Sequence, residues 1–284
     1  MKITLFSPAK LNLFLHILKR RKDGYHDLQT AFQLIDLKDT LTFELRKDAQ
    51  IHLHTDLTFP AKENLIWQAA KSLQQHAQVS LGVNIQLEKK IPMGAGLGGG
   101  SSNAATTLIA LNHLWKTHLS LETLAKLGQA LGADVPLFVK GKSSWAEGIG
   151  ELLTPMSWPE SWYLLLIPAC HVKTAEVFSH PNLIRNSPRI NATDFLSHPE
   201  KTRNDFEPLV RRLYPLIDQT FLWLDSFHLS VKPRLTGSGC AIFVKIQHPD
   251  EAIPFLAQKP ANLEIILAKS SNSSCPLNNL KWLF

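Results

Sequence analysis

A run of small residues from Gly94 to Ser102 is the part of the chain best suited to binding phosphate. Five of the seven residues from Gly94 to Gly100 are glycines, and two serines follow. Glycine lets a ligand approach the backbone closely. Where such a loop opens a helix, unpaired N–H groups and the positive end of the helix dipole converge on one place that suits phosphate. A plain turn would not need five glycines, since each costs backbone entropy on folding. The run therefore predicts a phosphate loop.

Three familiar nucleotide-binding loops do not explain this run. Gly94, Gly96 and Gly99 match the dinucleotide pattern G-x-G-x-x-G. However, a Rossmann unit continues into a second strand, and residues 120–131 predict a second helix instead. A Walker A loop ends in Gly-Lys-Ser or Gly-Lys-Thr, whereas this loop contains no lysine. The His-Arg-Asp and Asp-Phe-Gly motifs of protein kinases are absent from the sequence.

Three segments together resemble the GHMP kinases, a superfamily of small-molecule kinases. They are residues 92–102 (Pro-Met-Gly-Ala-Gly-Leu-Gly-Gly-Gly-Ser-Ser), 7–12 (Ser-Pro-Ala-Lys-Leu-Asn) and 235–241 (Leu-Thr-Gly-Ser-Gly-Cys-Ala). Within the superfamily, the chain is most similar to kinases that act on a cytidine-diphosphate-linked methylerythritol in the non-mevalonate route to isoprenoids. That closer similarity also rests on Asp-Gly-Tyr-His at residues 23–26, Asn-Ala-Ala at 103–105 and Gly-Ala-Asp-Val-Pro at 132–136.

The resemblance implies both a reaction and a fold. The reaction is the ATP-dependent phosphorylation of the 2-hydroxyl of that substrate, with Mg2+ as the metal cofactor. The fold is an α+β, two-domain GHMP kinase fold, with ATP and substrate in the cleft between the domains. We expect an N-terminal β/α domain with the glycine-rich loop at residues 1–157 and a C-terminal α/β sandwich at residues 158–284. A break rich in Pro, Ser and Trp at residues 155–162 supports this boundary.

Two charged residues, Lys10 and Asp134, are the catalytic candidates. From the residues alone, Asp134 is a polar residue after a helix and Lys10 a surface lysine whose stem lies along a strand. The resemblance implies that Asp134 is the general base that takes the proton from the attacking hydroxyl. It implies that Lys10 lies beside Asp134, keeps the carboxylate ionised and helps to fix the hydroxyl.

The resemblance also assigns residues to the ATP site. The expected loop residues are Pro92, Met93, Gly94, Ala95, Gly96, Leu97, Gly98, Gly99, Gly100, Ser101 and Ser102. Asn64 is either a contact near adenine or an N-terminal helix cap, and both interpretations stay open. The supporting turn from the second domain is expected at Thr236, Gly237, Ser238 and Gly239, where a plain turn is the alternative. No carboxylate can be singled out as a Mg2+ ligand, although Ser101 and Ser102 are candidate contacts to phosphate or metal.

A base-binding pair is implied at Tyr25 and His26. In the resembled kinases the tyrosine stacks on cytosine and the histidine bonds to the edge of the base. Stacking on an aromatic ring contributes about 1–3 kcal/mol per base. Phe178 would close the other side, with Thr174 nearby, and Asn12 would contact the substrate. The ordinary alternative for Tyr25 and His26 is half-buried packing.

The elements that must position these residues follow from hydrophobic periodicity. Alternation predicts strands over residues 11–17, 30–37, 41–45, 51–54 and 83–87, with Lys38-Asp39 as a turn. Helical spacing predicts helices over residues 63–78, from the glycine loop to about 115, and over 120–131 with Ser120 as N-cap. The second half predicts strands over 163–167, 241–246 and 263–268, and helices over 208–227 and 249–257.

Composition limits the class of protein. A hydrophobic fraction of 44% and a charged fraction of 19% are those of a globular chain. The formal net charge of +6 suits nucleic acid, a membrane surface or a phosphorylated small molecule. We interpret the basic cluster at residues 19–22 as a solvated loop. Three widely spaced cysteines without a zinc or disulfide pattern, and the lack of a signal peptide or an 18-residue apolar run, predict a cytoplasmic protein.

Two alternative functions stay open from the sequence. One is another GHMP kinase, acting on mevalonate or homoserine, and Tyr25 and His26 argue against it because those substrates have no base to stack. The other is a non-catalytic nucleotide-binding or RNA-binding protein, and Lys10 and Asp134 argue against it because binding alone needs no base. We therefore expect ATP and the small-molecule substrate as partners, with no nucleic acid and no membrane. A monomer and a homodimer both fit.

Overall fold

The computed structural model describes residues 1–274. The predicted end of the C-terminal domain, with Cys275, lies outside the described residues. The first half contains strands β1 (Lys2–Arg20), β2 (His26–Arg46), β3 (Ile51–His54), β4 (Gly82–Glu88), β5 (Ser144–Glu147) and β6 (Leu152–Pro155), and helices α1 (Leu65–His76), α2 (Gly99–Leu114), α3 (Leu121–Gln129) and α4 (Val135–Lys140). The second half contains β7 (Trp162–Pro168), α5 (Thr174–Ser179), α6 (Ala192–Ser197), α7 (Glu207–Leu213), α8 (Pro215–Asp225), β8 (Arg234–Leu235), β9 (Ile242–Ile246), α9 (Ile253–Ala257) and β10 (Leu263–Ser271).

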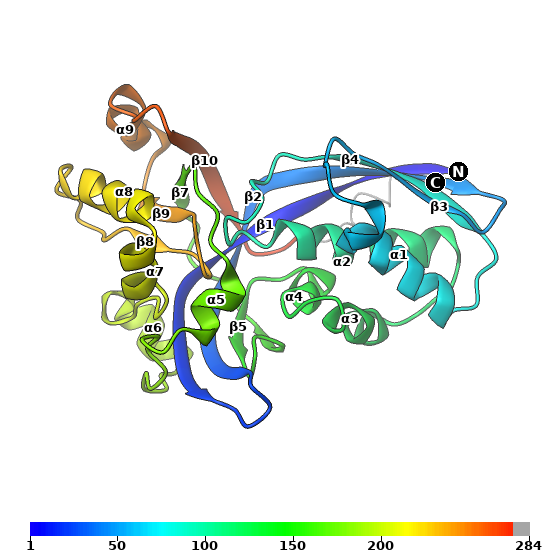
Figure 1. The fold of residues 1–284 in the computed structure, drawn as a ribbon, viewed down its shortest axis with the longest axis horizontal. Helices are drawn as coiled ribbons and strands as arrows, with labels where there is room; N and C mark the ends of the chain where they lie inside the picture. Colours follow the sequence, from blue (N-terminus) through cyan, green and yellow to red (C-terminus); the bar gives the residue numbers. More distant parts are fainter. Residues whose placement is uncertain (275–284) are drawn as a thin grey trace.

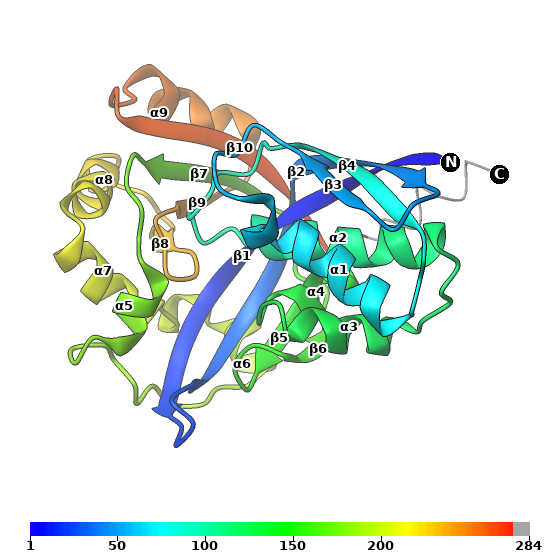
Figure 2. The ribbon, with the colours of Figure 1, turned by 45° about the vertical axis from the view of Figure 1, so that its right-hand side comes forward.

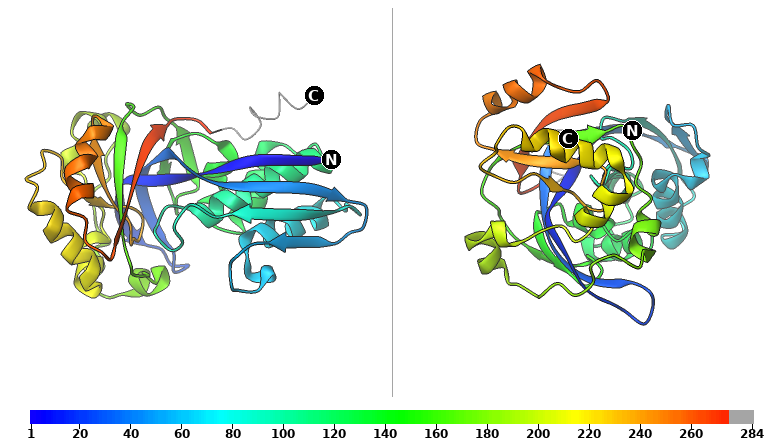
Figure 3. Two further views of the ribbon diagram at one scale, coloured as in Figure 1. Left: turned by 90° about the horizontal axis from the view of Figure 1, so that it is seen from above. Right: turned by 60° about the vertical axis from the view of Figure 1, so that its left-hand side comes forward.

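Strands β1 and β2 form a long antiparallel pair that reaches from one half of the molecule into the other (Figures 1 and 3). The pairing runs from Lys2 opposite Glu44 to Arg20 opposite His26. β4 pairs with the second half of β2, while β10 pairs with the middle of β2 and also with β7. One path of strands, in the order β3-β4-β2-β10-β7-β9-β8, therefore connects both halves.

The first hydrophobic core lies between the strands of the N-terminal half and helices α1–α4, which gather on one side of those strands (Figures 1 and 2). Alternate residues of β1 and β2, such as Ile3, Leu5, Leu41 and Phe43, point into it. Helix α2 is buried on nearly all sides. Its small residues, including Ala104, let neighbouring elements approach closely, so the start of α2 is firmly held.

The second core combines the C-terminal elements with residues from β1 and the glycine loop. Ala9 and Leu11 of β1 and Ala95 and Leu97 of the loop belong to this core. The loop is therefore packed against the second core, while the helix that it opens is packed in the first. This arrangement fixes the loop between the two halves.

The α+β class is confirmed, and so are most predicted elements. Ser120 caps α3, since its Oγ accepts a hydrogen bond from the Thr123 backbone N–H at 3.2 Å. The boundary at residues 157/158 stays a prediction. The segment around this boundary is hydrogen-bonded to β2, because the Trp158 indole N–H donates to the Phe32 carbonyl at 2.8 Å. Among the described residues, no helix is long and apolar enough to cross a bilayer.

The predicted turn at Lys38-Asp39 is wrong, because β2 continues through it. β1 pairs with this stretch from one side, and β4 pairs with β2 from Thr40 onward. The Asp39 carboxylate is fully buried and satisfied, since it accepts from the backbone N–H groups of Lys90 and Ile91 at 2.7 and 2.8 Å. A local turn signal is thus overridden by pairing and by partners fifty residues away.

The predicted helix over residues 208–227 is also wrong as a single element. It is divided into α7 and α8 at Tyr214, whose φ of −124° and ψ of 90° are not helical. Pro215 is the cause, because proline disfavours the helical conformation of the residue before it and lacks the N–H needed inside a helix. The predicted helix over 249–257 begins as a 3-10 turn at Pro249–Ala252 and continues as α9. The short elements α4, β5, β6, α5 and α6 were not predicted.

Candidate active site

One cavity of about 680 Å³ collects most of the predicted site residues. It is lined from both halves of the chain. The first half contributes Lys10, Asn12, Asn64, the loop from Pro92 to Ser101, and Asp134, and the second half contributes Thr174, Phe178, Gly237 and Ser238. Tyr25 and His26 are not among the lining residues.

The glycine loop takes backbone conformations that require glycine. Gly94, Gly96 and Gly98 have φ values of 68°, 77° and 73°. A Cβ on Gly96 would lie 2.4 Å from the carbonyl oxygen of Thr236, which shows how closely the loop approaches the turn from the second half. The Ala241 N–H also donates to the Ala95 carbonyl at 3.0 Å. The structure therefore brings the predicted supporting turn against the loop.

Gly98 is the N-cap of α2 and provides no side-chain cap, so N–H groups at the start of α2 remain available at the cavity. The two predicted serines differ. Ser101 lines the cavity, whereas Ser102 is fully buried and its hydroxyl accepts a hydrogen bond from Ser7 at 2.8 Å. Ser101 is thus the serine whose hydroxyl can reach a bound phosphate.

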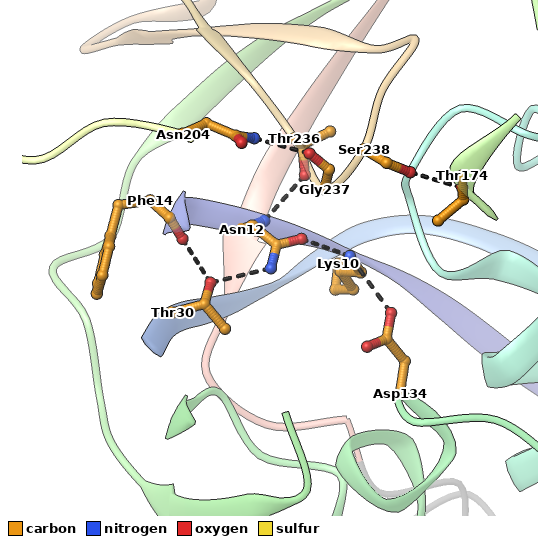
Figure 4. A network of polar contacts seen from close by, with 10 residues as sticks. All are labelled: Lys10, Asn12, Phe14, Thr30, Asp134, Thr174, Asn204, Thr236, Gly237 and Ser238. Atoms are coloured by element: carbon orange, nitrogen blue, oxygen red, sulfur yellow. Dashed lines mark hydrogen bonds and ion pairs between the residues drawn. The ribbon is translucent and has the colours of Figure 1, made fainter. Parts of the chain in front are cut away.

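Lys10 and Asp134 come together at the cavity (Figure 4). The Lys10 Nζ lies 3.4 Å from Asp134 Oδ2 and donates to Asn12 Oδ1 at 2.5 Å. The Lys10 side chain is 4% exposed, whereas that of Asp134 is 30% exposed and so can meet a ligand. Asp134 stands at the N-cap position of α4, directly after the turn that follows α3. The pair places a proton acceptor beside a fixed positive charge.

The amide of Asn12 is oriented by its other contacts (Figure 4). Its Nδ2 donates to Thr30 Oγ1 at 2.9 Å, which leaves Oδ1 facing Lys10. The Asn12 backbone N–H donates to Thr236 Oγ1 at 2.9 Å. Asn12 therefore connects β1, β2 and the turn that supports the loop.

The base-binding candidates are only partly brought together. The ring centroids of His26 and Phe178 lie 5.3 Å apart, and His26 is 6% exposed. Tyr25 is 60% exposed, and it has no ring contact within residues 1–274. Burial, followed by repulsion from Arg185 and Arg20, lowers the pKa of His26 from its usual value.

Asn64 and Thr174 also lie at the cavity. The Asn64 side chain accepts from the Ile66 N–H at 2.9 Å, so it caps α1 as well as lining the cavity. The hydroxyls of Thr174 and Ser238 are 2.7 Å apart, which joins the start of α5 to the turn over residues 236–239.

Sequence reasoning missed several residues that hold this site. Asn204 donates through Nδ2 to the Gly237 carbonyl at 2.7 Å (Figure 4). The same nitrogen donates to the Leu235 carbonyl at 2.8 Å, and so Asn204 fixes the turn over residues 236–239. Lys89 lines the cavity near Gly99 and pairs with the buried Asp39 at 2.5 Å. Neither belongs to a motif. Their roles depend on partners far along the chain, so no local signal marks them.

No group of three or more His, Cys, Asp or Glu side chains with metal-binding geometry occurs among the residues that the structure describes. Mg2+ usually keeps several waters and takes one or two protein ligands together with phosphate oxygens of the substrate. The sparse oxygen set around Ser101 and Asp134 fits that mode, in which the nucleotide provides most of the ligands.

Comparison with known proteins gives a consistent result. Residues 64–142 match the family described as GHMP kinases N terminal domain. A 4-diphosphocytidyl-2-C-methyl-D-erythritol kinase of Pseudomonas aeruginosa (strain UCBPP-PA14) is 48% identical over 283 residues, which cover 99% of each chain. The enzyme of that name from Hahella chejuensis is 48% identical and is covered over 97% of its length, with 98% of this chain.

Solved structures agree with the sequence relatives. A crystal structure of 4-(cytidine 5'-diphospho)-2C-methyl-D-erythritol kinase is similar with a TM-score of 0.81 and 31% identity, over 95% of this chain and 99% of the other. The mevalonate kinase of Methanococcus jannaschii is similar with a TM-score of 0.69 and 17% identity, over 96% and 99% of the two chains. The second likeness concerns the fold alone.

Proposed function

From the family to which this chain belongs, the 4-diphosphocytidyl-2-C-methyl-D-erythritol kinases among the GHMP kinases, we propose that it transfers the terminal phosphate of ATP to the 2-hydroxyl of that compound. The chain is a phosphotransferase of small-molecule alcohols in isoprenoid precursor synthesis. The observation that carries the detailed proposal is the pair of Lys10 and Asp134 in the same cavity as the glycine loop.

In the proposed step, Asp134 acts as general base. Its carboxylate accepts the proton of the attacking hydroxyl, the hydroxyl oxygen forms the new bond to the γ-phosphorus, and ADP leaves with the electrons of the broken P–O bond. Lys10 holds Asp134 at 3.4 Å and is itself held by Asn12. The carboxylate that accepts the proton is thus kept in one orientation. Such positioning is most of what phosphoryl transfer requires of a protein.

The loop would hold the phosphates of ATP. Free N–H groups at the start of α2 point into a site that also receives the positive end of the α2 dipole. Ser101 would add a hydroxyl contact to phosphate or to Mg2+, and Asp134 is a carboxylate that lines the same cavity. When bound, Mg2+ supplies neutralisation of charge on the phosphate oxygens.

The cytidine end of the substrate would bind at His26 and Phe178. The buried histidine ring offers hydrogen bonds to a base edge, and Phe178 lies against it at 5.3 Å. The exposed Tyr25 ring is free to cover the other face of the base. Thr174 and Asn12, which line the cavity together with Phe178, would contact the rest of the substrate.

The test is ADP release by the purified chain with ATP and Mg2+, with the cytidine-diphosphate substrate, mevalonate and homoserine offered in parallel. We expect turnover with the first compound alone. Turnover with mevalonate or homoserine instead would support phosphoryl transfer to an alcohol but would refute the proposal that His26 and Phe178 bind cytosine. No turnover with any of the three would refute the proposed reaction.

A further inference from the structure

Arg185 connects His26 to the segment that carries Phe178. Its Nε donates to His26 Nε2 at 3.0 Å, although the two residues are 159 positions apart in the sequence. The terminal nitrogen Nη2 donates to the carbonyls of Phe178 and His180 at 2.9 and 2.8 Å, and Nη1 donates to that of Leu183 at 3.1 Å. One guanidinium group therefore positions both the imidazole ring of His26 and the backbone segment that carries Phe178.

Because Arg185 is the donor in the hydrogen bond to His26, this bond determines which imidazole nitrogen carries the proton. An arginine side chain has only N–H donors and stays protonated in proteins. His26 Nε2 must therefore be the nitrogen with a free lone pair. A neutral imidazole carries its single proton on one nitrogen, which here is Nδ1.

The surroundings keep the ring neutral. His26 is buried, and the nearby charges of Arg185 and Arg20 oppose a second proton, so the pKa of His26 lies below its usual value. Within residues 1–274, Nδ1 of His26 has no hydrogen-bonding partner. The ring thus keeps one N–H donor for a ligand.

We propose that Arg185 is a positioning residue for base specificity. It holds His26 in the tautomer with a proton on Nδ1, and this N–H can donate to N3 of cytosine but not to N3 of uracil. Cytosine has a lone pair on N3, whereas uracil has an N–H there, and two donors cannot bond to each other. The proposal rests on the proposed function, since it places the base of the substrate at His26. A site built around one hydrogen-bonding pattern rejects an analogue that leaves its buried groups unpaired.

The first test reads the tautomer without any substrate. Spectra that correlate imidazole 15N and 1H in the full chain at neutral pH distinguish a protonated nitrogen from a bare one, and the His26 signals are identified by their loss in His26→Gln. We expect a protonated Nδ1 and a bare Nε2 in the unmodified protein. In Arg185→Met we expect a shift toward protonated Nε2. A protonated Nε2 in the unmodified protein would overturn the proposal.

The second test compares kcat/KM for the cytidine substrate and for its uridine counterpart. We expect the unmodified protein to prefer the cytidine compound, and Arg185→Met to reduce that preference by roughly ten- to hundredfold, mainly through KM. Arg185→Lys keeps a charged donor and is expected to retain more of the preference. An unchanged preference in Arg185→Met, or an equal loss for both nucleotides, would overturn the proposal.

Arg189→Met is the matched control. Arg189 lies on the same segment, but its exposed side chain pairs with Glu147 at 2.8 Å and does not touch His26. We expect its nucleotide preference and its His26 spectrum to match those of the unmodified protein. The two tests separate the two hypotheses. A bare Nε2 without turnover would refute the proposed function, whereas turnover with a protonated Nε2 would refute the role of Arg185.

Discussion

Thr30 determines which way the side-chain amide of Asn12 faces. Its hydroxyl accepts from Asn12 Nδ2 at 2.9 Å and donates to the Phe14 carbonyl at 2.5 Å. This leaves Asn12 Oδ1 as the oxygen that holds Lys10. Thr30, which also lines the cavity, thus transmits its position through Asn12 to the ammonium group beside Asp134.

We predict that Thr30→Val lowers kcat about fivefold, because loss of one hydrogen bond, about 1 kcal/mol, loosens the Lys10 ammonium group. Steady-state kinetics with both substrates checks this prediction. Thr42→Val is the control, since it makes the same change on the same strand, where the hydroxyl meets only Thr4 at 3.0 Å on the surface. An equal loss in both variants would contradict the argument.

At this scale the sequence predicts residues inside motifs and misses those that act through distant partners. Lys10 and Asp134 lie in motifs of the resembled family, and the structure brings them within 3.4 Å. Thr30, Arg185 and Asn204 have no motif, and their partners lie 18, 159 and 31 positions away. Such contacts become visible only when the strands and loops are placed in space.

At the scale of elements, the glycine loop and the turn over residues 236–239 function as one unit. Gly96 lies so close to Thr236 that even a methyl group would clash with its carbonyl oxygen. Gly100 differs, because it is helical and a Cβ there would meet only Leu65 Cδ1 at 3.5 Å, an ordinary contact. Substitution of Gly100 by alanine is thus a control for the same substitution at Gly96 in the same loop.

We predict that Gly96→Ala lowers the Tm by about 2–6 °C, since a left-handed conformation costs a non-glycine residue roughly 1–2 kcal/mol and the clash adds to it. Gly100→Ala is expected to leave the Tm unchanged or to raise it, because alanine is favoured over glycine in a helix. Thermal unfolding without nucleotide measures both. A stable Gly96→Ala variant would show that the loop and the turn are not in contact.

Periodicity predicted most elements, and the errors have physical causes. β2 passes through Lys38-Asp39 because buried partners satisfy the Asp39 carboxylate, which no local pattern reveals. The division of residues 208–227 at Pro215 was visible in the sequence, since proline disfavours helix in the residue before it. The first error needed tertiary information, and the second did not.

At the scale of the whole molecule, β1 links the two hydrophobic cores. Ile3 and Leu5 belong to the first core, and Ala9 and Leu11 belong to the second. The phosphate loop also joins the second core, although the helix that follows it lies in the first. Neither core can lose its part of β1 without disturbing the other.

We therefore predict that both halves unfold in one transition. Hydrogen exchange at increasing denaturant should expose peptides from α2 and from β9 together, because shared strands couple the two cores. Separate midpoints for these two elements would contradict this prediction and would favour two independently folding domains.

The measurement that tests the central claim most directly compares turnover and ATP affinity in Asp134→Asn. General base catalysis contributes roughly 10²–10⁴-fold, so we predict a loss of kcat in that range with ATP binding, measured by calorimetry, close to that of the unmodified protein. Asp225→Asn, at an exposed site at the end of α8, is the control and should keep full turnover. Near-native turnover of Asp134→Asn would contradict the assignment of Asp134 as the base.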